Sequence, residues 1–169
     1  PPRSTLFPYT TLFRSIFLDT CIFFEIHEND RTYHSFTHWK NKDYFLTTSL
    51  TVIGELIQEL SPKPEKSAYL HTLWGFVEDV DFSLLVPNSR VSYACYLLCK
   101  YNEDERMKAE YTDLVHLAYA IAYKVPIFIT TDRHLSHFRI PYKMVEKGFQ
   151  QPIIKDIETM EKEILNKKG

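Results

Sequence analysis

The chain is poor in glycine and has no excess of positive charge. It holds 4 glycines in 169 residues, which excludes collagen-like and Gly-rich low-complexity sequences, and no Gly-rich phosphate loop is present. Lysine and arginine number 20 against 22 aspartates and glutamates, so the net charge is -2. A protein that binds nucleic acid by charge alone is expected to be strongly basic. Any nucleic-acid role must therefore come from a local site, with a metal supplying positive charge.

Cysteine is also scarce, and long apolar runs are missing. Cys21, Cys95 and Cys99 form no CxxC pair, and their spacing fits no zinc ribbon. We expect buried thiols and a reducing cytoplasm. No apolar run approaches the roughly 18 residues of a membrane helix. The hydrophobic content of 44% is enough for a sizeable core, so disorder is excluded and one domain is expected.

The first fifteen residues look unlike the rest of the protein. Residues 5–15 (TLFPYTTLFRS) resemble the in-frame translation of a sequencing-adapter oligonucleotide. They lack the continuous apolar core and the small-residue cleavage site of a signal peptide. We therefore expect residues 1–15 to be adapter-derived and residues 16–169 to be the single native domain. A genuine N-terminal extension is the alternative.

Short apolar runs alternate with helical patterns along the rest of the chain. Strands are expected at 16–19, 44–47, 82–86 and 125–130, with a last edge strand at 142–145. Helices are expected at 20–27, 31–42, 49–60, 65–80, 90–101, 113–123 and 153–166, with a turn at 102–105 and caps at Ser49, Ser89 and Thr112. The alternation predicts an α/β fold with a mainly parallel sheet covered on both faces. Ligands of such sheets bind at the carboxyl ends of the strands.

Four acids stand out by their place in this pattern. Asp19 ends the first strand, Glu55 lies about two turns into the helix after the second, Asp113 opens the helix before the fourth, and Asp132 follows the fourth. Taken singly, each has a simple explanation as a helix cap, a helix-dipole partner or a solvated side chain. Capping does not explain why all four favour one edge of one sheet.

Converged carboxylates favour one kind of chemistry. They repel each other unless a cation lies between them, and hard oxygen ligands select Mg²⁺ or Mn²⁺. Such ions bind a phosphodiester, lower the pKa of a bound water and stabilise the leaving oxygen. They also reverse the local charge, so an acidic site can hold a polyanion.

Four pieces of the sequence carry a family resemblance. They are IFLDT at 16–20, TSLTVIGELIQEL at 48–60, YTDLVHLAYAIAYKVPIFIT at 111–130 and TTD at 130–132. In this order they resemble the PIN-domain ribonucleases: a strand ending in Asp-Thr, a Ser/Thr before a helical Glu, an Asp opening an Ala-rich helix and a final Thr-x-Asp. The resemblance covers residue 16 to the C-terminus, with 31–42 and 148–169 matching only loosely.

The resemblance implies a three-layer α/β/α fold and a metal-dependent endoribonuclease. Asp19, Asp113, Glu55 and Asp132 would be catalytic and hold Mg²⁺ or Mn²⁺, while Thr20 and Thr130 would be substrate-positioning residues. Small single-domain members are mostly VapC-type toxins, so the resemblance also implies an RNA substrate, a small cognate antitoxin and a homodimer. The alternatives are an RNA-processing PIN nuclease without an antitoxin and a non-catalytic RNA- or protein-binding module. The intact set of four acids argues against the last.

Three other patterns are weaker. FLDTC has Cys21 where a haloacid-dehalogenase-type phosphatase needs an acid. The histidine pairs 34/38 and 134/137 lack a third ligand, so surface or packing roles are expected. The aromatic residues between 23 and 45 are expected to form core and dimer interface rather than an RNA-stacking surface.

Overall fold

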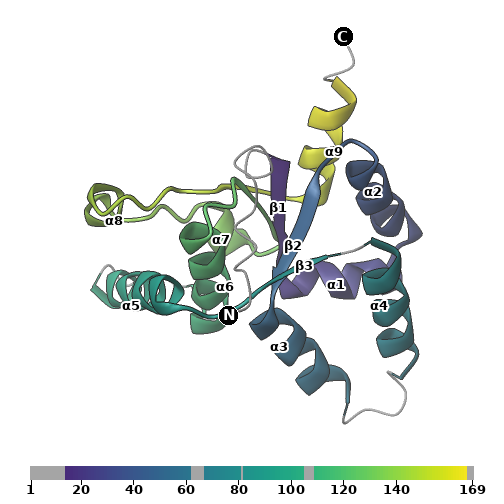
Figure 1. The fold of residues 1–169 in the computed structure, drawn as a ribbon, viewed down its shortest axis with the longest axis horizontal. Helices are drawn as coiled ribbons and strands as arrows, with labels where there is room; N and C mark the ends of the chain where they lie inside the picture. The colour runs from purple at the N-terminus through teal and green to yellow at the C-terminus, as the bar shows by residue number, and fades with distance from the viewer. Residues whose placement is uncertain (1–13, 62–66, 81, 105–108, 167–169) are drawn as a thin grey trace, which may run out of the picture.

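The computed structural model describes residues 14–61, 67–80, 82–104 and 109–166, and its centre is a parallel β-sheet (Figure 1). The strands of this sheet are β1 (Ser15–Leu18), β2 (Phe45–Ser49), β3 (Ser83–Leu85), β4 (Ile127–Ile129) and β5 (Ile153–Lys155). Their spatial order is β3-β2-β1-β4-β5, and every neighbouring pair is parallel. The expected parallel sheet is confirmed.

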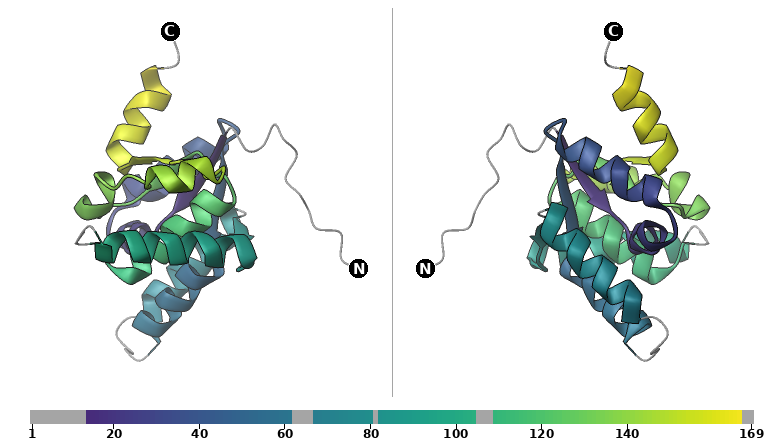
Figure 2. Two further views of the ribbon diagram at one scale, coloured as in Figure 1. Left: turned by 90° about the vertical axis from the view of Figure 1, so that its left-hand side faces the viewer. Right: turned by 90° about the vertical axis from the view of Figure 1, so that its right-hand side faces the viewer.

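Helices cover both faces of the sheet (Figures 1 and 2). One side carries α1 (Thr20–Glu28), α2 (Asp30–Lys40), α3 (Leu50–Leu60), α4 (Ser67–Val80) and α9 (Ile157–Asn166). The other carries α5 (Ser89–Asp104) and α6 (Tyr111–Ala122), which pack against each other, with the short α7 (Arg133–Ser136) and α8 (Tyr142–Glu146) nearby. This confirms the three-layer α/β/α architecture. Within the described ranges, no helix has the length and apolar character needed to cross a bilayer.

Aromatic packing fixes the centre of the core. Phe17 of β1 lies opposite Phe128 of β4 in the strand register, and their rings stack with centroids 5.1 Å apart. Both side chains are fully buried. Phe36 and Trp39 of α2 are buried as well and meet edge to face at 5.0 Å. These α2 aromatics therefore belong to the core, as their segment predicted.

The region after residue 140 differs from the expected order of elements. Residues 142–145 form α8 rather than an edge strand, because Pro141 directs the chain into a short helical turn. The last strand is β5, inside the segment expected to be one helix. Asp156 then starts α9 by accepting a hydrogen bond from the Thr159 backbone N–H at 2.7 Å. Two β-branched residues, Ile153 and Ile154, favour the strand before this cap.

The ends of α5 also lie elsewhere than expected. Asn88, not Ser89, is the cap, since its Oδ1 accepts from the Val91 backbone N–H at 2.9 Å. The helix continues through 102–104, which was expected to be a turn. Asn102 is buried there and donates to the Ala109 carbonyl at 3.1 Å, so its side chain ties the end of α5 to the start of α6.

Of the two other expected helix caps, one is confirmed and one is wrong. Ser49 caps α3 as expected, accepting from the Val52 backbone N–H at 3.1 Å. At α6 the cap position is Glu110, which makes no side-chain cap bond, and Thr112 lies inside the first turn. The expected cap at Thr112 is therefore wrong.

Residues 1–13 lie outside the described part of the chain, so the expected adapter-derived origin of 1–15 stays a prediction. Ser15 is already part of β1 and pairs with Phe45. A hydrophobic core then runs through the described chain from Ile16 to Ile164.

We predict that Phe128→Ala lowers the free energy of unfolding by about 3–5 kcal/mol, because it removes a fully buried ring and leaves a cavity. Urea denaturation measures the change. Tyr142→Ala is the control: this ring is 74% exposed, and about 0.5 kcal/mol or less is expected. Equal losses in the two variants would contradict a core centred on the Phe17–Phe128 pair.

Candidate functional site

Asp19 lies directly after β1 and is the most heavily hydrogen-bonded of the four acids. Its Oδ1 accepts from the Thr20 backbone N–H at 2.9 Å and lies 2.9 Å from Nδ1 of His116. Its Oδ2 accepts from the Thr130 hydroxyl at 2.6 Å and from the Cys21 thiol at 3.5 Å. The side chain is buried. The carboxylate therefore joins the β1–α1 junction to α6 and to the segment after β4.

This environment keeps Asp19 ionised. Burial alone would raise the pKa of its carboxyl, but the hydrogen bond and positive charge of His116 and the hydrogen bonds from Thr130 and Thr20 outweigh it. The pKa consequently lies below its usual value. An ionised carboxylate can only accept hydrogen bonds, so Nδ1 of His116 carries the proton of their shared bond.

Glu55 reaches the same place from α3. Its Oε2 accepts from the Thr20 hydroxyl at 2.6 Å and lies 3.3 Å from Nε2 of His116. This Nε2 is buried but makes no hydrogen bond within the described residues. The side chain of Glu55 is about a quarter exposed, so one side of the site faces solvent.

Asp113 precedes His116 by one turn of α6 and is only half-buried. Burial and the negative charges of Asp19, Asp132 and Glu110 raise its pKa to about 7, while His116 acts in the opposite direction. Asp113 thus lies within electrostatic reach of two of the other three acids. Near neutral pH its carboxyl is poised between its two protonation states.

Asp132 follows β4 and caps α7. Its Oδ1 caps α7 by accepting from the backbone N–H groups of His134 and Leu135. Its own backbone N–H donates to the Thr130 hydroxyl at 3.0 Å, and its charge contributes to the raised pKa of Asp113. It is a helix cap that also adds negative charge to the site.

Two nearby side chains were not singled out from the sequence. His116 is buried between Asp19 and Glu55, and only its spacing of three residues from Asp113, which places both on one face of α6, could have indicated it. Cys21 packs against Asp19 and Thr130. Burial and the charge of Asp19 raise the pKa of this thiol to about 11, so it stays protonated and is no nucleophile at neutral pH.

The acid site fits a divalent cation by its chemistry. Its donors are carboxylate oxygens, and burial together with the negative charges of Asp19, Asp132 and Glu110 raises the pKa of Asp113. Across the described ranges, however, no three His, Cys, Asp or Glu side chains are placed to hold a metal together, and this includes the two histidine pairs.

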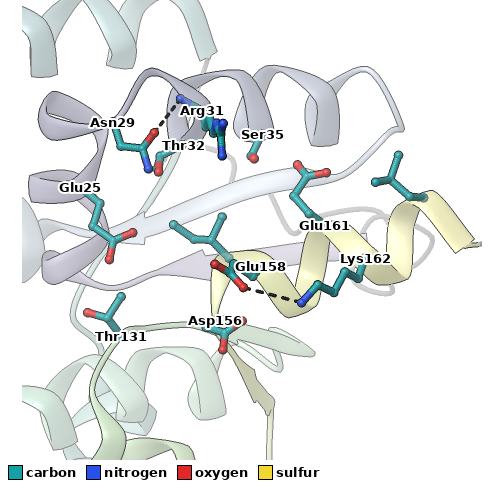
Figure 3. Close-up of a pocket in the computed structure, with 12 residues that line it drawn as sticks. Glu25, Asn29, Arg31, Thr32, Ser35, Thr131, Asp156, Glu158, Glu161 and Lys162 are labelled. Carbon is teal, nitrogen blue, oxygen red and sulfur yellow. Dashed lines mark hydrogen bonds and ion pairs between the residues drawn. The ribbon is translucent and has the colours of Figure 1, made fainter.

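A groove of about 860 Å³ runs from Thr131, beside this site, between α2 and α9 (Figure 3). Its charged lining residues are Glu25, Asp156, Glu158, Glu161, Arg31 and Lys162. Acids outnumber bases along it, and Lys162 is 3.6 Å from Glu158. The charge of this groove therefore does not favour an RNA backbone.

Comparison with protein-family models assigns most of the chain to one family. The model of the PIN domain matches residues 16–141. The chain belongs to the PIN domain family. PIN domains are generally nucleases and generally use divalent metal ions. The carboxylate oxygens of this site are ligands of the kind that such ions prefer. No curated protein matches the sequence of this chain significantly.

Solved structures share the fold of this PIN domain. A chain of DNA-bound VapBC from Salmonella typhimurium aligns with a TM-score of 0.66 at 15% identity, covering 85% of this chain and 98% of that one. VapBC2 from Rickettsia felis, bound to a promoter DNA fragment, gives 0.65 at 17% identity, covering 84% and 98%. VapBC-1 from nontypeable Haemophilus influenzae gives 0.63 at 14% identity, covering 85% and 98%. At these identities the likeness establishes the fold.

The raised pKa of Asp113 predicts a pH-dependent stability. Folding raises this pKa, so the folded protein binds the proton more tightly, and the stability this provides is lost as pH rises from about 4 towards 7. Asp113→Asn removes the ionisation. We expect the variant to become more stable than wild type over this range. The expected difference at pH 8 is about 1–2 kcal/mol, less than the full pKa shift corresponds to, because water screens a half-buried charge.

Urea denaturation at several pH values measures the difference. Asp156→Asn is the matched control with the opposite sign. Hydrogen bonds from Thr159 lower the pKa of Asp156, so this variant should lose stability relative to wild type as pH rises through the acid range. A pH-independent difference for Asp113→Asn would contradict the proposed repulsion among the acids.

Proposed function

We propose that this PIN domain is a Mg²⁺- or Mn²⁺-dependent endoribonuclease that hydrolyses RNA phosphodiester bonds. The observation that carries the proposal is the acid cluster around the buried, ionised Asp19. Glu55 joins it through Thr20, and Asp113 and Asp132 add negative charge beside it. A net charge of -2 does not count against an RNA substrate if these acids bind cations.

In this proposal some residues of the site bind the metal ion, and others hold those ligands in place. Asp19, Glu55, Asp113 and Asp132 would be the metal ligands. A bound divalent ion supplies a water of lowered pKa and offsets the charge of the phosphodiester. The hydroxyls of Thr20 and Thr130 are bonded to Glu55 and Asp19, so we assign these threonines to positioning the acids rather than the substrate.

We further propose that the protein is the toxin of a type II toxin–antitoxin pair. The support is its sequence resemblance to VapC-type toxins and its structural likeness to chains of three VapBC complexes. A small cognate antitoxin and a homodimer belong to this proposal. A cytoplasmic location agrees with the three cysteines, which are free in the structure. An RNA-processing nuclease without an antitoxin is the alternative if no such partner is encoded next to the gene.

Asp113→Asn is the sharpest test of the nuclease. We expect RNA cleavage by the full chain to fall by about 100-fold or more, comparable to the loss of one preorganised electrostatic group. Asp113 is half-buried and its charge is unfavourable to folding, so the variant should remain folded. Asp19→Asn is a poorer test, because the amide cannot replace a carboxylate that accepts hydrogen bonds on both oxygens.

Cleavage of a labelled structured RNA is measured with Mg²⁺, with Mn²⁺ and with excess EDTA. Glu146→Gln, an exposed acid of α8, is the control for loss of a negative charge and should cleave as wild type does. Wild-type protein without metal-dependent cleavage would refute the nuclease. Full activity in Asp113→Asn would show that the assignment of the acids is wrong.

A further inference from the structure

His116 connects two acids that come from different elements of the fold. Its imidazole lies between Asp19, after β1, and Glu55, on α3, with Nδ1 2.9 Å from Asp19 Oδ1 and Nε2 3.3 Å from Glu55 Oε2. Thr20 connects the same two carboxylate oxygens from the other side, through its backbone N–H and its hydroxyl. The four residues therefore form a ring of three hydrogen bonds that the 3.3 Å contact between Nε2 and Oε2 completes.

The burial of this histidine gives the ring its rigidity. The side chain of His116 is 1% exposed, and both of its nitrogens face carboxylates. Nδ1 bonds Asp19, and Nε2 lies 3.3 Å from Glu55 Oε2 without a hydrogen bond within the described residues. A buried imidazole without such charged neighbours would cost free energy. The histidine is thus placed by its charged neighbours as well as by packing.

The ring also sets where α6 lies relative to the acids. Asp113 is on the same face of this helix, one turn before His116. Any movement of His116 away from Asp19 would therefore displace Asp113 as well. One side chain links the placement of three of the four acids.

We propose that His116 is a positioning residue that fixes Asp19 and Glu55 relative to each other at the proposed cation site, chiefly through its Nδ1–H bond to Asp19. This inference rests on the proposed function, because it concerns the metal site of that nuclease. His116 is not one of the four proposed metal ligands, so its role differs from theirs.

Two substitutions separate the two sides of the ring. In His116→Asn the amide lies where Nδ1 lies, so a donor to Asp19 is kept and the group facing Glu55 is lost. In His116→Gln the amide reaches the place of Nε2, so the group facing Glu55 is kept and the donor to Asp19 is lost. The inference predicts that the glutamine variant is the more damaged of the two.

Mn²⁺ binding to the full chain without RNA, measured by calorimetry or electron paramagnetic resonance, is the readout. We expect His116→Gln to weaken Mn²⁺ affinity by about 10–100-fold, the range found when a partner that orients metal ligands is removed, and His116→Asn to weaken it less. Melting temperatures establish that each variant is folded at the temperature of the titration.

Tyr119→Phe is the matched control. Tyr119 lies one turn further along α6, is equally buried, and its hydroxyl bonds Thr51 of α3 at 3.0 Å. Its removal deletes a part-buried α6–α3 hydrogen bond without touching an acid. We expect a lower melting temperature and unchanged Mn²⁺ affinity.

A second measurement uses the wild-type chain and does not depend on any variant folding. With ¹⁵N-labelled histidine, titration with Mg²⁺ should shift the ring resonances of His116, since its two neighbours would become ligands. Unchanged His116 resonances while Mg²⁺ binds would overturn the inference.

The possible results distinguish this inference from the proposed function. Wild-type binding of Mn²⁺ without RNA cleavage would refute the nuclease and leave the role of His116 intact. The inference alone is overturned if both His116 variants bind Mn²⁺ within about twofold of wild type, if the asparagine variant is the weaker, or if Tyr119→Phe loses as much affinity as His116→Gln. A wild type that binds no divalent ion overturns both.

Discussion

The fold depends on keeping one buried negative charge satisfied. Asp19 is 3% exposed and ionised, and a buried charge is tolerated only when donors surround it. Its donors come from the start of α1, from α6 and from the residue after β4, so these segments cannot separate without leaving the carboxylate unpaired. The requirement that stabilises the site is therefore also a requirement on the packing of α6 against the sheet.

The same environment acts on two aspartates in opposite directions. Asp19 accepts hydrogen bonds from His116 and Thr130, so its pKa falls, whereas burial and the repulsion of neighbouring acids raise the pKa of Asp113. Hydrogen-bond donors thus offset the charge of the buried, ionised Asp19, while the half-buried Asp113 experiences the charges of its neighbours.

The sequence predicted the layers and the sheet because apolar runs and helical periodicity are local properties. It also singled out four acids, of which Asp19 and Asp132 follow strands and Glu55 and Asp113 lie on helices; their catalytic role stays a prediction. It did not predict α8, a short helix after Pro141, or β5, a three-residue strand that exists through its pairing with the distant β4. His116 escaped for a similar reason: its role lies in contacts with Asp19 and Glu55, 97 residues away in the first case, and no local pattern contains them.

The register of β1 against β4 has a consequence for how this protein can change in evolution. Phe17 stacks on Phe128, and two residues later Asp19 meets Thr130, so the same short spacing on both strands sets the core and the site together. A slip of one residue would turn every side chain to the opposite face. Substitutions along these strands can be accommodated one at a time, but a single inserted or deleted residue between ring and acid would destroy both at once. Insertions and deletions are therefore expected to be tolerated in the loops and not between these paired positions of β1 and β4.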